Sequence, residues 1–116
     1  MDSFRSGCPI ATTLDLVGDR WSLVVVRDML TGKKRYGEFL DSPEGIPTNI
    51  LAERLKRLVD ARIAERVLYQ ERPRRFEYLL TARGEGLRAV LQAICRWANR
   101  EFPKTWTPPE SFMRCD

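Results

Sequence analysis

The chain has 116 residues, of which 43% are hydrophobic and 31% charged, and its 20 lysines and arginines exceed its 16 acidic residues to give a net charge of +4. These proportions exclude an intrinsically disordered chain and predict one folded domain with a buried core. The longest apolar run, Leu23–Val26, is far too short to span a membrane, and the first residues lack the apolar stretch of a signal peptide. We therefore expect a cytoplasmic protein.

The residue types that most enzymes and metal sites require are scarce. The chain has no histidine, which is the commonest general base and metal ligand, and its three cysteines, Cys8, Cys95 and Cys115, form no CxxC pair. It contains no P-loop and no glycine-rich dinucleotide-binding motif. We therefore expect no catalytic activity, no bound metal and no cofactor.

A first helix is predicted over residues 9–17. Pro9 suits the opening turn because its φ is already close to the helical value, and Gly18 ends the segment. The apolar residues of this helix recur at helical spacing and share one face: Ile10, Leu14 and Val17. Such a face requires another element to pack against.

A second helix is predicted over residues 20–30, with Asp19 as its capping residue and Gly32 as its stop. The valine run at 24–26 favours a strand locally, but the length between the acidic cap and the glycine fits a helix better. Its apolar residues point in nearly all directions around the axis. We expect it to be the most buried helix of the chain.

Residues 36–58 predict a helix-turn-helix. Residues 36–40 form a short amphipathic helix, residues 42–45 are rich in turn formers, and a further helix begins near Ile46 or Pro47. In that helix one apolar stripe faces the core, formed by Leu51, Leu55 and Leu58. The opposite face is polar and narrow enough to enter a groove of DNA. Helical hairpins of this spacing also occur in proteins that bind no nucleic acid.

A β-hairpin is predicted next, with strands at residues 63–70 and 76–80. The turn at residues 71–75 carries three guanidinium groups, those of Arg72, Arg74 and Arg75. Residues 33–75 hold eleven Lys or Arg against seven Asp or Glu, which accounts for the whole net charge of the chain. Basic hairpin tips are often merely solvated, but a basic hairpin directly after a helix-turn-helix is typical of a winged helix, whose arginines can hold phosphate oxygens.

A long helix is predicted from Ala82 to about Glu101, with Thr81 as its cap. One stripe at helical spacing runs along it, formed by Leu87, Leu91, Ile94 and Trp97. This stripe could complete the core of a monomer. Because a chain of this size already has enough elements around one core, we expect the stripe and the first helix to form a homodimer. The proline-rich tail at residues 107–116 is expected to be extended.

Short motifs follow one another in a fixed order along residues 8–106. They are Cys8-Pro9, Leu14–Gly18 with Trp21-Ser22, Gly32 to Tyr36, Gly45-Ile46 to Leu51, Arg54–Leu58, Glu77-Tyr78 to Thr81 with Gly84, and Trp97. This ordered set resembles the HxlR family of bacterial transcriptional regulators. The resemblance implies a winged helix-turn-helix domain over residues 8–106 that is mainly α with a small β-hairpin. It also implies that the terminal helices form a homodimer and that this homodimer binds operator DNA.

Two positions depart from the pattern of that family. The family usually has serine or another capping residue just before the recognition helix, where this chain has Pro47. The glycine that follows the family's recognition helix is Arg62 here, and a non-glycine residue at positive φ costs about 1 kcal/mol. We expect either a different turn at this point or a tolerated strain.

We predict a sequence-specific DNA-binding transcriptional regulator that acts as a homodimer on an inverted repeat. The residues expected in the major groove are Thr48, Asn49, Ala52, Glu53 and Lys56. The residues expected to hold phosphates are Arg35, Arg72, Arg74 and Arg75. The alternative function is a winged-helix module that contacts protein or RNA through the same surface.

Cys8 is a candidate thiol switch. The resemblance implies that in some family members the cysteine of the Cys-Pro pair senses quinones, aldehydes or oxidants, so the expected effector is a small electrophile or oxidant. Directly before Pro9, Cys8 would cap the first helix, where the helix dipole favours a thiolate. The alternative is a packed cysteine without a sensing role, since free cysteines are among the most buried residues.

Overall fold

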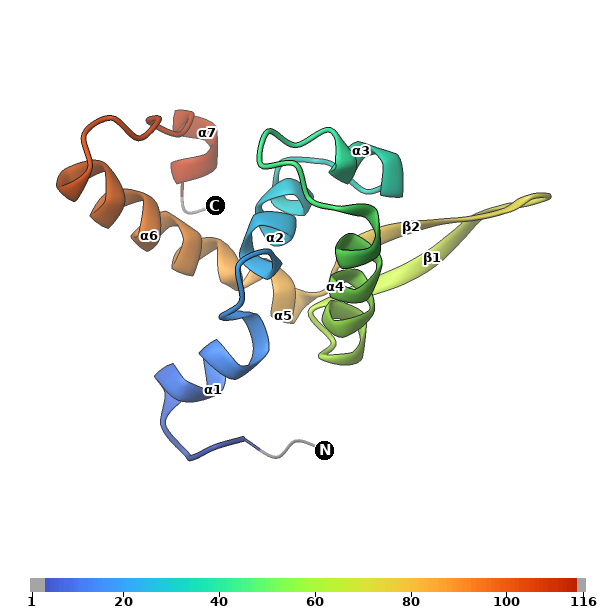
Figure 1. Cartoon of the computed structure of the whole chain (residues 1–116), viewed down its shortest axis with the longest axis horizontal. Helices are drawn as coiled ribbons and strands as arrows, with labels where there is room; N and C mark the ends of the chain where they lie inside the picture. The colour runs from blue at the N-terminus through green and yellow to red at the C-terminus, as the bar shows by residue number, and fades with distance from the viewer. Residues whose placement is uncertain (1–3, 115–116) are drawn as a thin grey trace.

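The computed structural model describes residues 4–114 and has a mainly helical architecture with one antiparallel β-hairpin (Figure 1). Its elements are α1 (Pro9–Val17), α2 (Ser22–Leu30), α3 (Tyr36–Leu40), α4 (Thr48–Asp60), β1 (Ala64–Glu71), β2 (Arg74–Leu80), α5 (Ala82–Glu85), α6 (Leu87–Glu101) and α7 (Glu110–Met113). Figure 1 shows the hairpin at one end, and α1, α6 and α7 toward the other. The predicted fold class, a winged helix-turn-helix, is confirmed.

The core lies around α2, which contacts α4, α6 and β2. Five of the nine residues of α2 are buried, more than in any other helix of residues 4–114: Ser22, Val25, Val26, Asp28 and Met29. The prediction that this helix is the most buried is confirmed. Because residues of α4 and the hairpin pack against the same core, the orientation of these two elements depends on α2.

The helix α2 begins at Ser22, two residues later than predicted, and its N-cap residue is Trp21 and not the predicted Asp19. Asp19 nevertheless binds the backbone at this end of the helix. The Asp19 carboxylate accepts hydrogen bonds from the backbone N–H groups of Trp21 (3.0 Å) and Ser22 (3.1 Å) and from the Nε of Arg54 on α4 (2.7 Å). Burial raises the pKa of Asp19, but its hydrogen bonds with Ser22, Arg54 and Trp21 outweigh that effect and hold the pKa well below its ordinary value. Asp19 therefore joins α2 to α4 as an anion.

We expect Asp19→Asn to lower the free energy of unfolding by about 2 kcal/mol at neutral pH, because the amide loses the ion pair with Arg54 and weakens the hydrogen bonds from Trp21 and Ser22. The pKa of this carboxyl is lower in the folded than in the unfolded protein, so its stabilising contribution is complete above the unfolded value of 3.8 and is lost as the pH falls below it. Urea denaturation should show the difference between wild type and variant shrinking below about pH 4. A difference that does not change with pH would contradict an electrostatic role.

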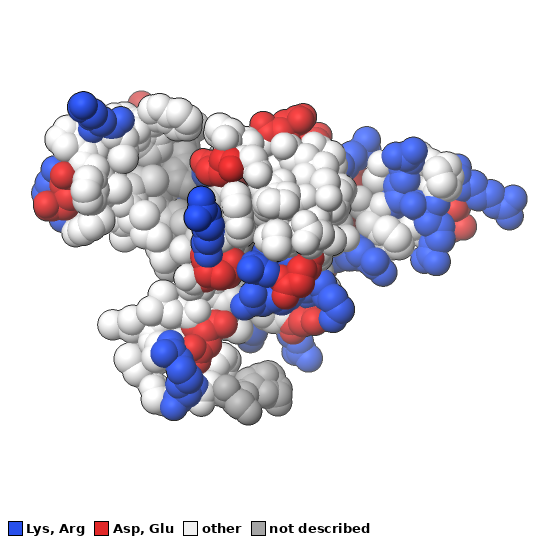
Figure 2. All heavy atoms as spheres, in the orientation of Figure 1, with Lys and Arg blue, Asp and Glu red and all other residues white. Residues whose placement is uncertain are grey.

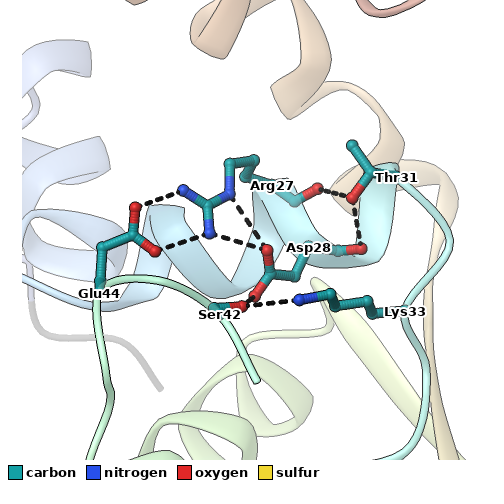
Figure 3. A network of polar contacts seen from close by, with 6 residues as sticks. All are labelled: Arg27, Asp28, Thr31, Lys33, Ser42 and Glu44. Atoms are coloured by element: carbon teal, nitrogen blue, oxygen red, sulfur yellow. Dashed lines mark hydrogen bonds and ion pairs between the residues drawn. The ribbon is translucent and has the colours of Figure 1, made fainter. Parts of the chain in front are cut away.

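A polar network anchors the turn between α3 and α4 to α2 (Figure 3). Both terminal nitrogens of Arg27 donate to the carboxylate of Glu44, at 2.8 and 2.9 Å, and one of them also donates to Asp28. The hydroxyl of Ser42 donates to Asp28 and accepts from the Nζ of Lys33 at 2.9 Å. The Glu44 contact raises the pKa of Arg27, while the Arg27 contact lowers the pKa of Glu44. The network thereby holds the turn that precedes α4.

The helix α4 carries the predicted apolar stripe on its buried side. Leu51, Leu55 and Leu58 are each at most 1% exposed, as expected from their spacing. The helix begins at Thr48, slightly later than the predicted start near Ile46 or Pro47, because Pro47 takes an extended conformation at the N-cap. No side chain caps this end of the helix, as the departure at Pro47 predicts.

The turn after α4 keeps a left-handed residue although no glycine is present. Arg62 has a φ of 60°, so the strain expected of a non-glycine residue is tolerated. The backbone N–H of Arg62 donates to the carbonyl of Val59 (3.0 Å), and that of Ile63 donates to Leu58 (2.9 Å). These hydrogen bonds and the burial of Ile63 stabilise the turn that leads from α4 into the hairpin.

The hairpin is longer and tighter than predicted. Its strands pair from Ala64 with Leu80 to Glu71 with Arg74, so only Arg72 and Pro73, joined by a cis peptide bond, form the turn. The predicted five-residue turn is wrong because Arg74 and Arg75 continue the ladder of β2. A register shift lies between Leu68 and Gln70.

The long C-terminal helix predicted from Ala82 is divided into α5 and α6 at Gly86. Thr81 caps α5 as predicted, since its hydroxyl accepts from the N–H of Gly84 at 3.1 Å. A Cβ at Gly84 would lie 2.1 Å from the carbonyl oxygen of Ile63, so α5 can pack this closely against the hairpin base only with glycine there. Gly86, a weak helix former, separates this packed turn from α6.

The prediction of an extended C-terminal tail is wrong for residues 110–113. Residues 106–109 have no regular structure, but Glu110–Met113 form α7. Phe112 is buried in the core, and its carbonyl accepts from Arg88 (3.2 Å) and Gln92 (3.0 Å) of α6. Pro108 and Pro109 therefore precede the helix without interrupting it, and the burial of Phe112 fixes the segment on α6.

Candidate nucleic-acid interface

The outward face of α4 is polar and exposed. All five residues predicted to enter a major groove lie on it: Thr48, Asn49, Ala52, Glu53 and Lys56. Glu53 pairs with Arg54, and Lys56 pairs with Asp60 one turn later at 2.9 Å. The structure thus brings these five residues together on the side of α4 opposite the leucine stripe.

The first turn of α4 has a support that the sequence analysis missed. The hydroxyl of Tyr36 on α3 donates to the backbone carbonyl of Thr48 at 2.6 Å. Behind α4, Arg54 is held by Asp19. Tyr36 appears in the family-like motif, but its spacing from Thr48 predicts no such contact, since the two residues belong to different helices. Together these contacts hold the exposed face of α4 in place.

The predicted phosphate-binding arginines of the hairpin are exposed. Arg72 lies in the turn, and Arg74 and Arg75 lie at the start of β2. None of the three forms an ion pair with an acidic residue within 4–114. Figure 2 shows lysine and arginine side chains gathered along the hairpin, and basic and acidic side chains interspersed around α4. A polyanion approaching the hairpin would therefore meet guanidinium groups without intramolecular carboxylate partners.

Arg35 occupies a different environment from the one predicted. Its Nε donates to Glu77 of β2 at 3.0 Å, and its guanidinium carbon lies 4.0 Å from the centre of the Tyr69 ring. The neighbouring Lys34 accepts a backbone hydrogen bond from Tyr78 at 2.7 Å. Arg35 thus joins the helix-turn-helix to the hairpin, although half of its side chain stays exposed. Its role toward phosphate remains a prediction.

The backbone around Arg35 is also fixed by an acidic side chain. Glu38 accepts from the N–H groups of Lys34 (2.8 Å) and Arg35 (3.0 Å). The hydrogen bond from Lys34 and, to a lesser extent, that from Arg35 lower the pKa of Glu38. The spacing from Arg35 to Glu38 resembles a capping box, which is the signal by which the sequence could have indicated this contact.

The hairpin carries a further basic residue that the sequence analysis left out. The guanidinium carbon of Arg66 on β1 lies 4.0 Å from the centre of the Phe76 ring on β2, and that of Arg74 lies 5.4 Å from the same ring. Such cation–π contacts orient arginines without neutralising them.

The predicted dimer stripe on α6 divides into two faces. Leu91 is only 8% exposed and belongs to the core of the monomer, and Leu87 packs against that core, so their assignment to an interface is corrected. Ile94 and Trp97 are 45% and 53% exposed. The two leucines therefore pack on the core, whereas Ile94 and Trp97 each leave about half of their surface exposed.

The outward face of α6 is apolar and shallowly grooved. A groove of about 700 Å³ is lined by Ala89, Val90, Ala93, Ile94 and Trp97. On α1, Ile10 is 71% and Leu14 is 54% exposed, while Val17 is buried. Two apolar helix faces thus lie toward the end of the molecule opposite the hairpin (Figure 1) and have no partner among residues 4–114.

Cys8 is the N-cap of α1 and is exposed. Its backbone N–H donates to the hydroxyl of Ser6 (3.1 Å), and its carbonyl accepts from the N–H of Thr12 (2.9 Å). Cys8 is therefore not packed within residues 4–114 of a single chain, and its sensing role remains a prediction. Cys95 is partly buried against the core, and Cys115 lies outside the described residues.

Residues 4–114 contain neither a metal-binding cluster nor a membrane-spanning helix. No group of three or more His, Cys, Asp or Glu side chains there is arranged to hold a metal ion. None of the helices in that part of the chain has the length and apolar character needed to cross a membrane.

Comparison with known proteins places this geometry among transcriptional regulators. The model of the HxlR-like helix-turn-helix family matches residues 16–105. The chain is 36% identical over 103 residues to the uncharacterized HTH-type transcriptional regulator Rv3095 of Mycobacterium tuberculosis, a match that covers 89% of this chain. It spans only 65% of the length of that relative.

Two solved structures are also similar. The reduced form of the transcriptional regulator YodB from Bacillus subtilis superposes with a TM-score of 0.70 at 32% identity, covering 87% of this chain and 100% of that one. The redox regulator HypR in its oxidized form superposes with a TM-score of 0.72 at 31% identity, covering 80% of this chain and 96% of that one.

Proposed function

Because the chain belongs to the HxlR-like helix-turn-helix family, we propose that it is a transcriptional regulator that binds operator DNA as a homodimer. One observation carries the proposal. The exposed polar face of α4 is held from behind by the core, and it adjoins a hairpin whose arginines have no carboxylate partners within residues 4–114. That combination suits a duplex with negative phosphates on either side of a groove.

In the proposed complex, α4 lies in the major groove and the hairpin contacts flanking phosphates. Asn49 can pair with adenine through two hydrogen bonds, and Glu53 can accept from cytosine. Thr48, Ala52 and Lys56 complete the face that meets the bases or their backbone. Arg72, Arg74 and Arg75 hold phosphates, and Arg35 contributes the exposed part of its guanidinium group.

The proposed dimer buries the outward faces of α1 and α6. Ile10 and Leu14 of α1 and Ile94 and Trp97 of α6 expose apolar surface whose removal from water favours association. A twofold dimer presents two copies of α4, which must enter successive major grooves on one side of the duplex. The operator is therefore an inverted repeat with half-sites spaced by about 10 base pairs or a multiple of that.

Footprinting of the purified protein on the DNA upstream of its own gene tests the proposal. Protection of an inverted repeat with the expected spacing would support it, together with binding to random duplex DNA that weakens steeply with salt, as counterion release requires. A preference for RNA, or retention by a protein partner without any DNA shift, would favour the alternative winged-helix module.

Arg74→Ala should weaken operator and random DNA alike, because a phosphate contact carries no sequence information. The slope of log affinity against log salt should become less negative by about one unit, as for one lost phosphate contact. Gel-shift titrations at several salt concentrations measure both quantities. Arg100→Ala, an exposed arginine on α6 paired with Glu101, serves as the matched control and should leave the slope unchanged.

We propose that Cys8 is the thiol through which small electrophiles or oxidants act. The similarity to the redox regulator HypR supports an oxidant as effector. Treatment with 1,4-benzoquinone should attach the quinone to the sulfur and lower operator affinity of the wild type, but not of Cys8→Ser. The structural reason is that Cys8 caps α1, part of the proposed dimer interface. Cys95→Ser is the matched control. Equal responses of wild type and Cys8→Ser would contradict the switch.

A further inference from the structure

A cleft of about 270 Å³ lies between α3 and the hairpin. Its walls carry four aromatic rings, two arginines and one glycine: Tyr36, Tyr69, Phe76, Tyr78, Arg74, Arg75 and Gly37. Tyr36 and Gly37 belong to α3, and the other lining residues belong to the hairpin. Three of the rings, those of Tyr36, Phe76 and Tyr78, are partly buried, so the cleft is a concave site whose walls combine aromatic and polar surface.

The cleft has a positive electrostatic character. Neither Arg74 nor Arg75 forms an ion pair with an acidic residue of 4–114. The guanidinium group of Arg35 stacks on the Tyr69 ring, and that of Arg66 stacks on the Phe76 ring. Of the acidic residues on the hairpin, Glu77 is engaged with Lys34 and Arg35, and Glu71 lies opposite Arg74 in the ladder but forms no ion pair with it. An anion entering the cleft would therefore meet guanidinium groups that can bind its oxygens.

Gly37 keeps one side of the cleft open. A Cβ built at this position meets no atom within 4 Å, and its φ is not positive, so the backbone does not require glycine. Glycine inside a helix is less favourable than alanine by about 1 kcal/mol. Neither the backbone conformation nor a close neighbour therefore requires glycine at position 37, although glycine weakens α3. The absence of a side chain there leaves open space at the cleft.

We propose that this cleft is a binding site for a planar aromatic carboxylate. Its aromatic part would lie among the rings of Tyr36, Phe76 and Tyr78, and its carboxylate would bind Arg74 and Arg75. The volume of about 270 Å³ lies just below the range for drug-sized ligands, which begins at about 300 Å³. The cleft therefore suits a smaller compound of one or two rings. Arginine suits this role because its planar fork matches the geometry of a carboxylate.

The position of the cleft connects its occupancy to DNA binding, a consequence that rests on the proposed function. Arg74 and Arg75 are among the proposed phosphate contacts, so a bound carboxylate would compete with DNA for them. Tyr36 also bonds the carbonyl of Thr48 in the first turn of α4. A ligand in this cleft therefore contacts both the hairpin and the support of α4.

Isothermal titration of the full chain with 1-naphthoate, without DNA, tests the site. We expect one molecule to bind per chain and at least tenfold weaker binding to Gly37→Leu, which fills the opening, and to Arg75→Ala. Arg100→Ala is the matched control and should bind as the wild type does. 1-Naphthalenemethanol, which lacks the charge, should bind at least tenfold more weakly. Gly37→Ala, a smaller change, should weaken binding less than Gly37→Leu.

Amide chemical shifts of the wild-type protein provide a readout that needs no variant. Saturating shifts confined to α3 and the hairpin support the site, whereas no saturable binding at millimolar 1-naphthoate, or wild-type affinity of a folded Gly37→Leu protein, overturns it. In gel shifts with random duplex DNA, 1-naphthoate should weaken binding by the wild type but not by Gly37→Leu. Binding of 1-naphthoate by a protein that binds no DNA would support the site while overturning the proposed function.

Discussion

Ile94→Asp should convert the proposed dimer into a monomer and lower operator affinity by about 100-fold or more, because linked half-sites bind far more tightly than single ones. Ile94 is 45% exposed and lines the apolar groove on the outward face of α6. Burying an unpaired carboxylate against a second copy of that face costs several kcal/mol, whereas in the monomer the same carboxylate stays in water.

Light scattering at micromolar protein measures the mass, and gel shifts measure the affinity for the operator and for a single half-site. The half-site affinity of Ile94→Asp should equal that of the wild type, which separates loss of the dimer from misfolding. Ile94→Val is the conservative control and should remain dimeric. A wild type that is monomeric under these conditions, or an Ile94→Asp protein that stays dimeric, would remove α6 as the dimer helix.

Asn49→Ala should weaken operator binding by about 1–3 kcal/mol, or roughly 5- to 150-fold, and leave random DNA unaffected. Asn49 is exposed in the first turn of α4, on the face opposite the buried leucines. Alanine is a good helix former, so α4 should persist in the variant. What is lost is the side-chain amide, which can donate to and accept from one adenine at once.

A double-mutant cycle checks this assignment. If Asn49 contacts a particular adenine, replacing that base should weaken the wild type but should weaken Asn49→Ala no further. Scanning each base pair of one half-site against both proteins identifies the contact. Equal losses on operator and random DNA would show that Asn49 positions the backbone and does not distinguish bases.

The contrast between α4 and α6 shows where sequence periodicity suffices. In α4 the three leucines are the only large apolar stripe, so their spacing alone determines which face is buried. In α6 apolar residues cover a wider arc, and both the core face with Leu91 and the outward face with Ile94 contain them. Periodicity indicates an apolar arc but cannot divide it between the core and an interface, because that division depends on where α2 and α7 pack.

The hairpin shows a similar limit. Its existence and its basic character follow from short-range patterns, namely β-favouring runs around an arginine-rich segment with one proline. The ladder extends further than the short-range pattern predicts, because pairing between strands is a tertiary event that can include residues beyond the apolar runs, such as Arg74. The pairing of Arg35 with Glu77, 42 residues apart, likewise has no local signal.

The sequence by itself determined the order of elements from α1 to the hairpin, the buried stripe of α4, the cap at Thr81 and the basic character of the hairpin, because each depends on residues within a turn or two of one another. The tertiary structure alone decided that Leu91 belongs to the core, that Phe112 fixes α7 on α6, and that Arg35 joins the helix-turn-helix to the hairpin. It also decided that aromatic rings of α3 and β2 enclose a cleft beside unpaired arginines. These features arise from contacts between distant segments, whose geometry follows only from how the helices and strands pack together.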